Sequence, residues 1–172
     1  MKEHGIRFPR QLETEFDPDA IRSALAERTA KLWPGGELYV PLININVPLK
    51  KALQTANLKG ALRCGLEGAS ARLKSEKAGI ENVREQSEAA YGERVSRLML
   101  FSNDGAERFY RHAEQLVLLH APRLLACILD IDSTALGKLI TGKDKQIKLV
   151  MAEHKDGVSE ILRAILTSRD RP

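Results

Sequence analysis

Three apolar runs in the sequence end in groups of polar side chains that could do chemistry. The runs lie at 95–101, 124–131 and 147–152. The polar residues at their ends are Asn103 and Asp104, then Asp130, Asp132, Ser133 and Thr134, and finally Glu153, His154, Lys155 and Asp156. Carboxylates, amides and imidazoles bind metal ions or transfer protons. We expect the three groups to share one edge of a sheet, because parallel sheets bind ligands beyond the carboxyl ends of their strands.

The first prediction for function is a non-catalytic module that binds an anionic or phosphorylated small molecule at this edge. Each polar group precedes a predicted helix, and the free amides and positive dipole of a helix N-terminus attract anions. Lys143 and Lys155 would add positive charge. The predicted ligand-binding residues are Asn103, Asp104, Ser133, Thr134, His154, Lys155 and Asp156. The alternative is that the Asp and Ser side chains only cap the helices, which needs no ligand.

The order Asp130-x-Asp132-x-Thr134 after an apolar strand resembles the first motif of the haloacid dehalogenase phosphatase superfamily. The resemblance covers 126–136. It implies a Mg²⁺-dependent phosphoryl-transfer enzyme in which Asp130 is the nucleophile and Asp132 the acid and base. That superfamily carries the motif on an early strand, whereas here little more than one strand and two helices come after it. Without that family's chemistry, Asp104, Asp130 and Asp132 could still hold Mg²⁺ as an acidic cluster.

Other kinds of site lack their motifs. No glycine-rich phosphate fingerprint comes after a predicted strand, which argues against dinucleotide and ATP binding. Ser102, His154 and Asp130 have the residue types of a catalytic triad, but no nucleophile-elbow motif surrounds Ser102. Cys64 and Cys127 are the only cysteines and lack metal-finger spacing, so we expect buried free thiols in a reducing compartment.

The most basic part of the chain lies at 50–77, inside a region predicted to be helical. Its lysines and arginines are opposed only by Glu67 and Glu76. A basic helix face can track a phosphate backbone, so an RNA-binding or assembly protein is the third prediction for function. No aromatic residue is interleaved there, which argues against stacking on bases.

Alternation of strands and helices predicts an α/β fold for the segment 93–168. Such alternation is typical of parallel strands joined by right-handed crossovers. The predicted strands are 95–101, 124–131 and 147–152, and the predicted helices are 104–120, 133–141 and 156–168. A further strand at 37–47 is expected at the sheet edge, because Pro41 cannot donate to a ladder. Together these elements predict a small three-layer unit with a mainly parallel sheet.

The N-terminal half, 1–92, is predicted to be mainly helical with that one edge strand. Asp17 and Pro18 begin a helix that Pro34 and the glycines after it end. A long helical region at 48–91 is expected to break near Gly60 and again near Gly79, because glycine weakens helices. The length of 172 residues suits a single domain over 1–172.

Composition and patterning also set expectations for location and partners. A formal charge of +4 permits contact with nucleic acid or another polyanion without requiring it. The N-terminus has no apolar core of signal-peptide length and no segment is apolar enough to span a bilayer, so a cytoplasmic protein without membrane contact is expected. A homodimer is plausible through the apolar seam at 62–83 or the edge strand at 37–47.

Overall fold

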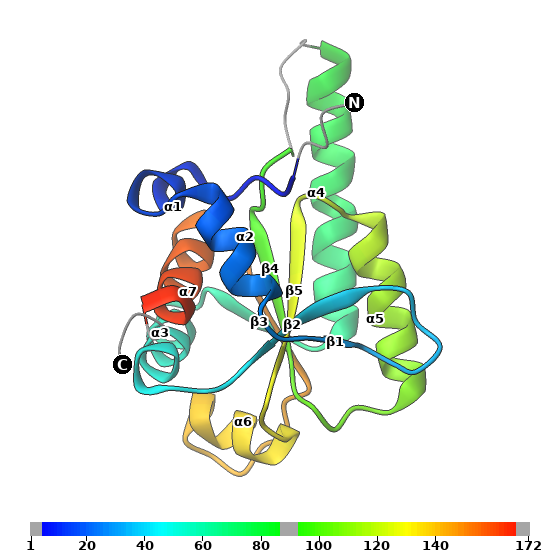
Figure 1. The fold of residues 1–172 in the computed structure, drawn as a ribbon. Coiled ribbons are helices and arrows are strands. Elements are labelled where there is room, and N and C mark those ends of the chain that lie inside the picture. Colours follow the sequence, from blue (N-terminus) through cyan, green and yellow to red (C-terminus); the bar gives the residue numbers. More distant parts are fainter. Residues whose placement is uncertain (1–4, 87–92, 168–172) are drawn as a thin grey trace.

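One mixed sheet with helices on both faces forms the centre of the protein (Figure 1). The computed structural model describes residues 5–86 and 93–167. The strands are β1 (Thr29–Lys31), β2 (Tyr39–Ile43), β3 (Leu62–Cys64), β4 (Arg97–Phe101), β5 (Leu124–Leu129) and β6 (Leu149–Ala152). The helices are α1 (Arg10–Glu15), α2 (Pro18–Ala26), α3 (Val47–Leu58), α4 (Leu66–Gln86), α5 (Glu107–Leu119), α6 (Ser133–Thr141) and α7 (Lys155–Thr167). The α/β class is confirmed.

The sheet has the strand order β1-β2-β5-β4-β6-β3. β5 pairs in parallel with both β2 and β4, whereas β6 runs antiparallel to β4. In that pairing Leu98 lies opposite Ala152, and Phe101 lies opposite Leu149. β1 and β3 add further antiparallel pairs at the two ends of the sheet. The prediction of a mainly parallel sheet is therefore wrong, and the direction of β6 is the main error.

The reason for the reversal lies in the connection between β5 and β6. α6 lies below the sheet in Figure 1, so it does not carry the chain back along a face to the other edge. Gly142, at φ 73°, ends α6, and the Ile147 amide then donates to the Ser133 carbonyl oxygen at 3.0 Å. β6 therefore starts at the edge where β5 ended, and it must run in the opposite direction.

Two apolar clusters cover the two faces of the sheet. Leu98 and Leu100 of β4 belong to one cluster, which includes residues from α2, α3, α6 and α7. Met99 and Phe101 belong to the other, which includes residues from α4 and α5. This division results from the two-residue repeat of a strand. All six residues of β5 are buried, as expected for a strand covered on both faces.

The strand predicted at 37–47 is β2, and it is not the edge of the sheet. β1 covers it on one side and β5 on the other. Pro41 lies opposite Thr29, and the parallel ladder with β5 begins only at Leu42. The missing amide hydrogen of Pro41 therefore costs no bond to β5. The edge position belongs to β1, where the predicted first helix has already ended at Ala26.

The predicted helical region at 48–91 contains a strand that was not expected. Gly60, at φ 68°, breaks it as predicted, and Gly65, at φ 88°, separates β3 from α4. Gly79 does not break the helix, because α4 continues past it to Gln86. The part of the predicted region at 87–91 lies outside the described residues.

The basis of the homodimer prediction changes with these assignments. Leu62 belongs to β3, while Ala69 and Leu73 are buried against the sheet, so the seam at 62–83 is not an open helix face. The strand at 37–47 is covered by β1. The homodimer stays a prediction without either feature behind it.

The two cysteines have different environments. Cys127 is buried in β5, and burial raises the pKa of its thiol to about 12. Cys64 is exposed at the end of β3, so its predicted burial is wrong. Both are free thiols.

None of the described helices is both long enough and apolar enough to cross a lipid bilayer.

Candidate functional site

The polar groups predicted to share one edge are divided between two edges of the sheet. These are the two opposite edges at which strands begin and end, not the outer strands β1 and β3. The reversed direction of β6 places its carboxyl end beside the start of β4. Asn103, Asp104, Asp130, Asp132, Ser133 and Thr134 lie at the edge where β4 and β5 end, whereas His154, Lys155 and Asp156 come after β6 at the opposite edge. The expectation of one shared site is thus corrected, while ligand binding by either group stays a prediction.

At the first edge, Asp130 is held by neighbouring polar side chains. Asn103 donates from Nδ2 to Asp130 Oδ1 at 3.2 Å, and an Arg28 guanidinium nitrogen lies 3.8 Å from Asp130 Oδ2. Arg28 also donates to Asn44 Oδ1 at 3.1 Å. These contacts join the ends of β2, β4 and β5. Asp130 is therefore engaged within the protein, although its side chain is exposed.

Asp104 and Asp132 act as caps at the start of α6. Asp132 accepts a hydrogen bond from the Ala135 amide at 2.7 Å. Asp104 accepts from the Ser133 amide at 2.9 Å and from the Ser133 hydroxyl at 2.7 Å. Burial raises the pKa of Asp104, but these hydrogen bonds outweigh burial and lower the pKa overall. The contacts support the capping alternative for both residues. Asp104, however, caps α6 rather than α5, the helix that follows it in the chain.

The metal-binding alternative gains no support at this edge. In the described part of the chain, no group of three or more His, Cys, Asp or Glu side chains could hold a metal ion. Asp104, Asp130 and Asp132 therefore do not converge as a set of Mg²⁺ ligands. Phosphoryl transfer by Asp130 and Asp132 stays an untested prediction.

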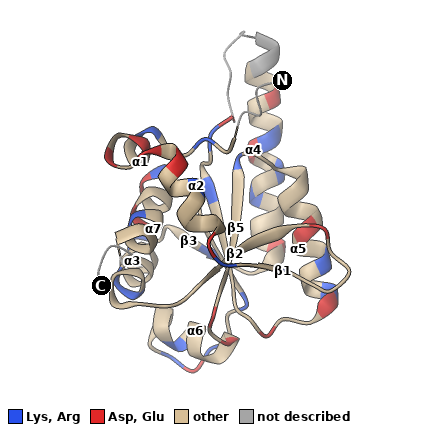
Figure 2. Cartoon of the chain, in the orientation of Figure 1, with Lys and Arg blue, Asp and Glu red and all other residues tan. Residues whose placement is uncertain are grey.

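The basic region at 50–77 does not form one continuous face. Lys50 and Lys51 belong to α3, which packs against α6 and α7. Lys74 and Lys77 belong to α4, on the opposite face of the sheet (Figures 1 and 2). β3 separates the two helices in the chain. The prediction of nucleic-acid binding by these helices therefore loses the continuous surface on which it was based.

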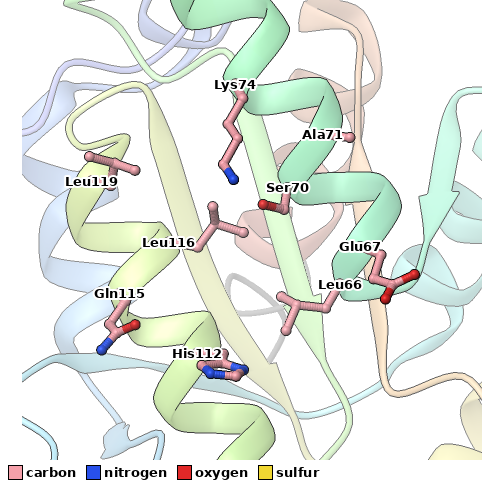
Figure 3. Close-up of a pocket in the computed structure, with 9 residues that line it drawn as sticks. All are labelled: Leu66, Glu67, Ser70, Ala71, Lys74, His112, Gln115, Leu116 and Leu119. Carbon is pink, nitrogen blue, oxygen red and sulfur yellow. The ribbon is translucent and has the colours of Figure 1, made fainter.

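A groove of about 590 Å³ lies between α4 and α5. Figure 3 shows Ser70 and Lys74 on α4 facing Leu116 and Leu119 on α5, with His112 below them. Its lining mixes three leucines and Ala71 with polar and charged side chains. None of the buried unpartnered polar atoms of the described residues belongs to this lining. The groove thus has no unpartnered buried polar atom, among the described residues, to which a particular ligand would bind.

A second cleft, of about 680 Å³, lies at the opposite edge, where β4 and β5 begin. We call it the arginine cleft. Its cationic lining residues are Arg7, Arg10, Arg94, Arg97, Arg123 and Lys155. Its acidic lining residues are Glu93 and Asp156. Figure 2 shows basic positions at the starts of β4 and β5, and the lining residues there are Arg94, Arg97 and Arg123. Two residues of the predicted ligand set, Lys155 and Asp156, therefore line a cleft with residues that the sequence did not single out.

Separate parts of the chain build the arginine cleft. The N-terminal arm, residues 5–9, is held in place by buried Phe8 and by the Val95 amide, which donates to the Arg7 carbonyl oxygen at 2.8 Å. Arg123 precedes β5 directly, and its carbonyl oxygen accepts from the Ser96 amide at 2.9 Å. α7 begins immediately after β6 and brings Lys155 with it. The cleft therefore lies between the arm, the starts of two strands and a helix N-terminus.

Some of the cleft's arginines are neutralised by acidic neighbours. Glu76 of α4 binds both Arg97, at 2.8 Å, and Arg123. Burial raises the pKa of Glu76, but the hydrogen bonds and charges of these two arginines outweigh burial and lower the pKa overall. Arg10 and Lys155 form no ion pair with any residue that the structure describes. The cleft therefore keeps an excess of positive charge.

Three buried groups that line the arginine cleft have polar atoms without a hydrogen-bond partner. They are the hydroxyls of Ser96 and Ser159 and the Nη1 atom of Arg123, none of which has a hydrogen-bond partner among the described residues. Their residues are 8 %, 1 % and 9 % exposed. An unsatisfied buried polar group costs about 1–3 kcal/mol. A ligand that bonds to these atoms would recover that free energy.

The first turn of α7 adds free donors to the same cleft. The first amides of any helix have no partner within the helix, and the dipole makes this end positive. Ser159 follows this first turn as the fifth residue of α7, and its buried hydroxyl has no hydrogen-bond partner among the described residues. The helix terminus and the unpartnered side chains thus favour the same kind of ligand, a small anion.

No protein-family model and no curated protein sequence matches this chain. The resemblance of 126–136 to a phosphatase motif is therefore not extended by a wider match. The geometry of the described residues is the remaining guide to function.

Proposed function

We propose that this protein is a non-catalytic module that binds a small anionic ligand in the arginine cleft. The observation that carries the proposal is the set of buried, unpartnered polar atoms of Ser96, Ser159 and Arg123 in a cleft with excess positive charge. The ligand class is the one expected from the sequence. The site lies instead at the opposite edge of the sheet.

The unpartnered atoms favour an acceptor-rich ligand. Guanidinium nitrogens can only donate, and a serine hydroxyl donates readily to an anion. Hydrogen bonds between charged partners are shorter and about twice as strong as those between neutral groups. Arg10 and Lys155 add positive charge with no ion-pair partner among the described residues. Phosphate, sulfate or a carboxylate supplies the acceptors and the opposite charge.

The same contacts favour binding over catalysis. A serine nucleophile needs a base within hydrogen-bond reach. Neither Ser96 nor Ser159 has any side-chain partner in the described part of the protein, so neither hydroxyl is activated. Glu93 lies 3.6 Å from Arg7, which ties up that carboxylate as an ion pair.

Calorimetric titration with inorganic phosphate and pyrophosphate tests the proposal. We expect both ions to bind, and Arg10→Gln and Lys155→Gln each to weaken binding by about threefold or more, since each removes one charge near the anion. Binding should also weaken as salt concentration rises.

Lys143→Gln is the matched control, because it removes one positive charge at the other edge of the sheet. It should leave binding unchanged. Loss of binding in Lys143→Gln, with Lys155→Gln unaffected, would instead place the anion at the edge where β4 and β5 end.

A further inference from the structure

We infer that the ligand of the arginine cleft is a small phosphorylated polyol, such as a sugar phosphate. Its phosphate would lie at the buried end against Arg123, and its hydroxyls would face Asp156. This inference depends on the proposed function and adds the chemical class of the ligand.

The buried end of the cleft matches a phosphate monoester. Such a group carries close to two negative charges at neutral pH and has three strong acceptor oxygens. Ser96, Ser159 and Arg123 each have a buried polar atom without a partner among the described residues, and each of these atoms could donate a hydrogen bond to a phosphate oxygen. Glu76 holds Arg123 through Nη2, which leaves Nη1 on the other branch of the guanidinium group for the ligand. A phosphate offers a separate oxygen to each of the three groups, whereas a carboxylate would have to share two oxygens and one negative charge among them.

The exposed end of the cleft requires a different chemistry. Asp156 is exposed, lines the cleft and forms no ion pair with any described residue. A second anionic group at this position would be repelled. A hydroxyl group would donate to the carboxylate, which accepts up to two such bonds at each oxygen. Asp156 therefore favours a ligand whose remaining part carries hydroxyls.

The lining of the cleft favours a sugar over a nucleobase, and its size suits a small molecule. A volume of about 680 Å³ lies in the range of small-molecule sites. The described uncharged lining includes Pro9, Ile80 and Val95 but no aromatic side chain. Bases gain affinity mainly by stacking on aromatic rings in sites without base-specific contacts. A nucleotide therefore has no advantage here over its sugar phosphate.

Three phosphate monoesters separate these contributions in calorimetric titrations of the full chain. Methyl phosphate carries the phosphate alone, ribose 5-phosphate adds the polyol, and adenosine 5′-monophosphate adds a base. We expect ribose 5-phosphate to bind about tenfold more tightly than methyl phosphate. A tenfold gain in affinity corresponds to the weaker end of the range for one hydrogen bond to a charged acceptor. We expect the base to add nothing further.

Asp156→Asn tests the role assigned to the carboxylate. The variant should bind methyl phosphate more tightly, because one negative charge is removed, and it should lose the tenfold preference for ribose 5-phosphate. Asp144→Asn, a charge-matched change in the exposed turn after α6, should alter neither value. Thermal melting of both variants confirms that they fold.

The outcomes distinguish the inference from the proposed function. Equal affinity for methyl phosphate and ribose 5-phosphate, or a preference that survives in Asp156→Asn, would overturn the polyol inference and leave anion binding intact. Much tighter binding of adenosine 5′-monophosphate or of a short RNA would replace the polyol with a nucleotide ligand. Failure of methyl phosphate, inorganic phosphate and pyrophosphate to bind would overturn both.

Discussion

Ser96 and Ser159 are buried residues whose hydroxyls would gain a hydrogen-bond partner when the proposed anion binds. Each hydroxyl lacks a partner among the described residues. Burial of an unsatisfied hydroxyl costs free energy, whereas a bond to an anion would recover it. A ligand-binding role therefore predicts opposite effects of removing these hydroxyls on stability and on affinity.

The variants Ser96→Ala and Ser159→Ala test this reversal. We expect the free energy of unfolding of each free variant to equal or exceed that of the wild type, by up to about 1 kcal/mol. We expect phosphate affinity to fall by up to about tenfold in each, since a donor is lost. Chemical denaturation and calorimetry measure the two quantities.

Ser133→Ala is the matched control at the other edge. Ser133 is also buried, but its hydroxyl donates to Asp104 at 2.7 Å. This variant should lose stability and keep its phosphate affinity. If Ser96→Ala and Ser159→Ala behaved like Ser133→Ala, their hydroxyls would be structural and the proposed site would lose its main support.

At the residue scale, the sequence predicted only part of the arginine cleft. Lys155 and Asp156 come directly after an apolar run, so local pattern singled them out. Arg10, Arg123 and Ser96 come from separate segments, and Lys155 and Asp156 reach them only because β6 runs antiparallel to β4. A weak signal was present in the paired arginines of two segments, Arg7 with Arg10 and Arg94 with Arg97.

At the scale of elements, Glu114 of α5 holds the loop before β2 in place by hydrogen bonds. Its carboxylate accepts from the Trp33 indole at 2.7 Å and from the amides of Glu37 and Leu38 at 2.9 and 2.7 Å. Burial raises the pKa of Glu114, but the hydrogen bonds from Leu38, Trp33 and Glu37 outweigh burial and lower the pKa overall. A carboxyl whose pKa is lower in the folded state stabilises the fold above its unfolded pKa.

The stabilisation by Glu114 should therefore disappear as pH falls below about 4.5, its unfolded pKa. Glu114→Gln leaves one buried donor without an acceptor, so we expect a loss of about 1–3 kcal/mol at neutral pH. The difference from the wild type should shrink in acid. Glu107→Gln removes an exposed pair with Arg111 in the same helix and should cost less than about 1 kcal/mol. Equal effects of the two changes would refute the role of Glu114.

Gly137 allows the turn after α6 to pack against that helix. A Cβ at this position would lie 1.4 Å from the Lys145 carbonyl oxygen. We expect Gly137→Ala to destabilise the protein by about 1–3 kcal/mol, as overpacking does. Gly79→Ala is the control, because a Cβ at Gly79 in α4 meets nothing within 4 Å, and it should raise stability by up to about 1 kcal/mol. Thermal melts that rank the two variants the other way would contradict this role of Gly137.

The elements that the sequence predicted best are those marked by a continuous apolar run or by a helix cap. The predicted strand at 124–131 and the predicted helix at 133–141 correspond to β5 and α6, because continuous apolar runs and caps are local signals. β1 and β3 have three residues each and were missed. Such short strands have no periodicity of their own and form because β2 and β6 offer them unpaired edges.

At the scale of the whole molecule, the direction of β6 decides which residues meet. A parallel β6 would have brought Lys155 and Asp156 to Asp130, whereas the observed strand brings them to Arg123. Strand direction depends on whether α6 spans a face of the sheet or stays at its edge. Where α6 lies, Gly137 packs closely against the turn that follows the helix, and no pattern of apolar residues encodes that contact.

A protein that works through the arginine cleft must bind its anion there and not where β4 and β5 end. Backbone amide shifts during titration with inorganic phosphate, measured by nuclear magnetic resonance, test this most directly. We predict that the largest shifts arise in the first turn of α7 and at Ser96, with little change in the first turn of α6. Large shifts at the start of α6, with α7 unchanged, would contradict the proposed site and return it to the edge that the sequence predicted.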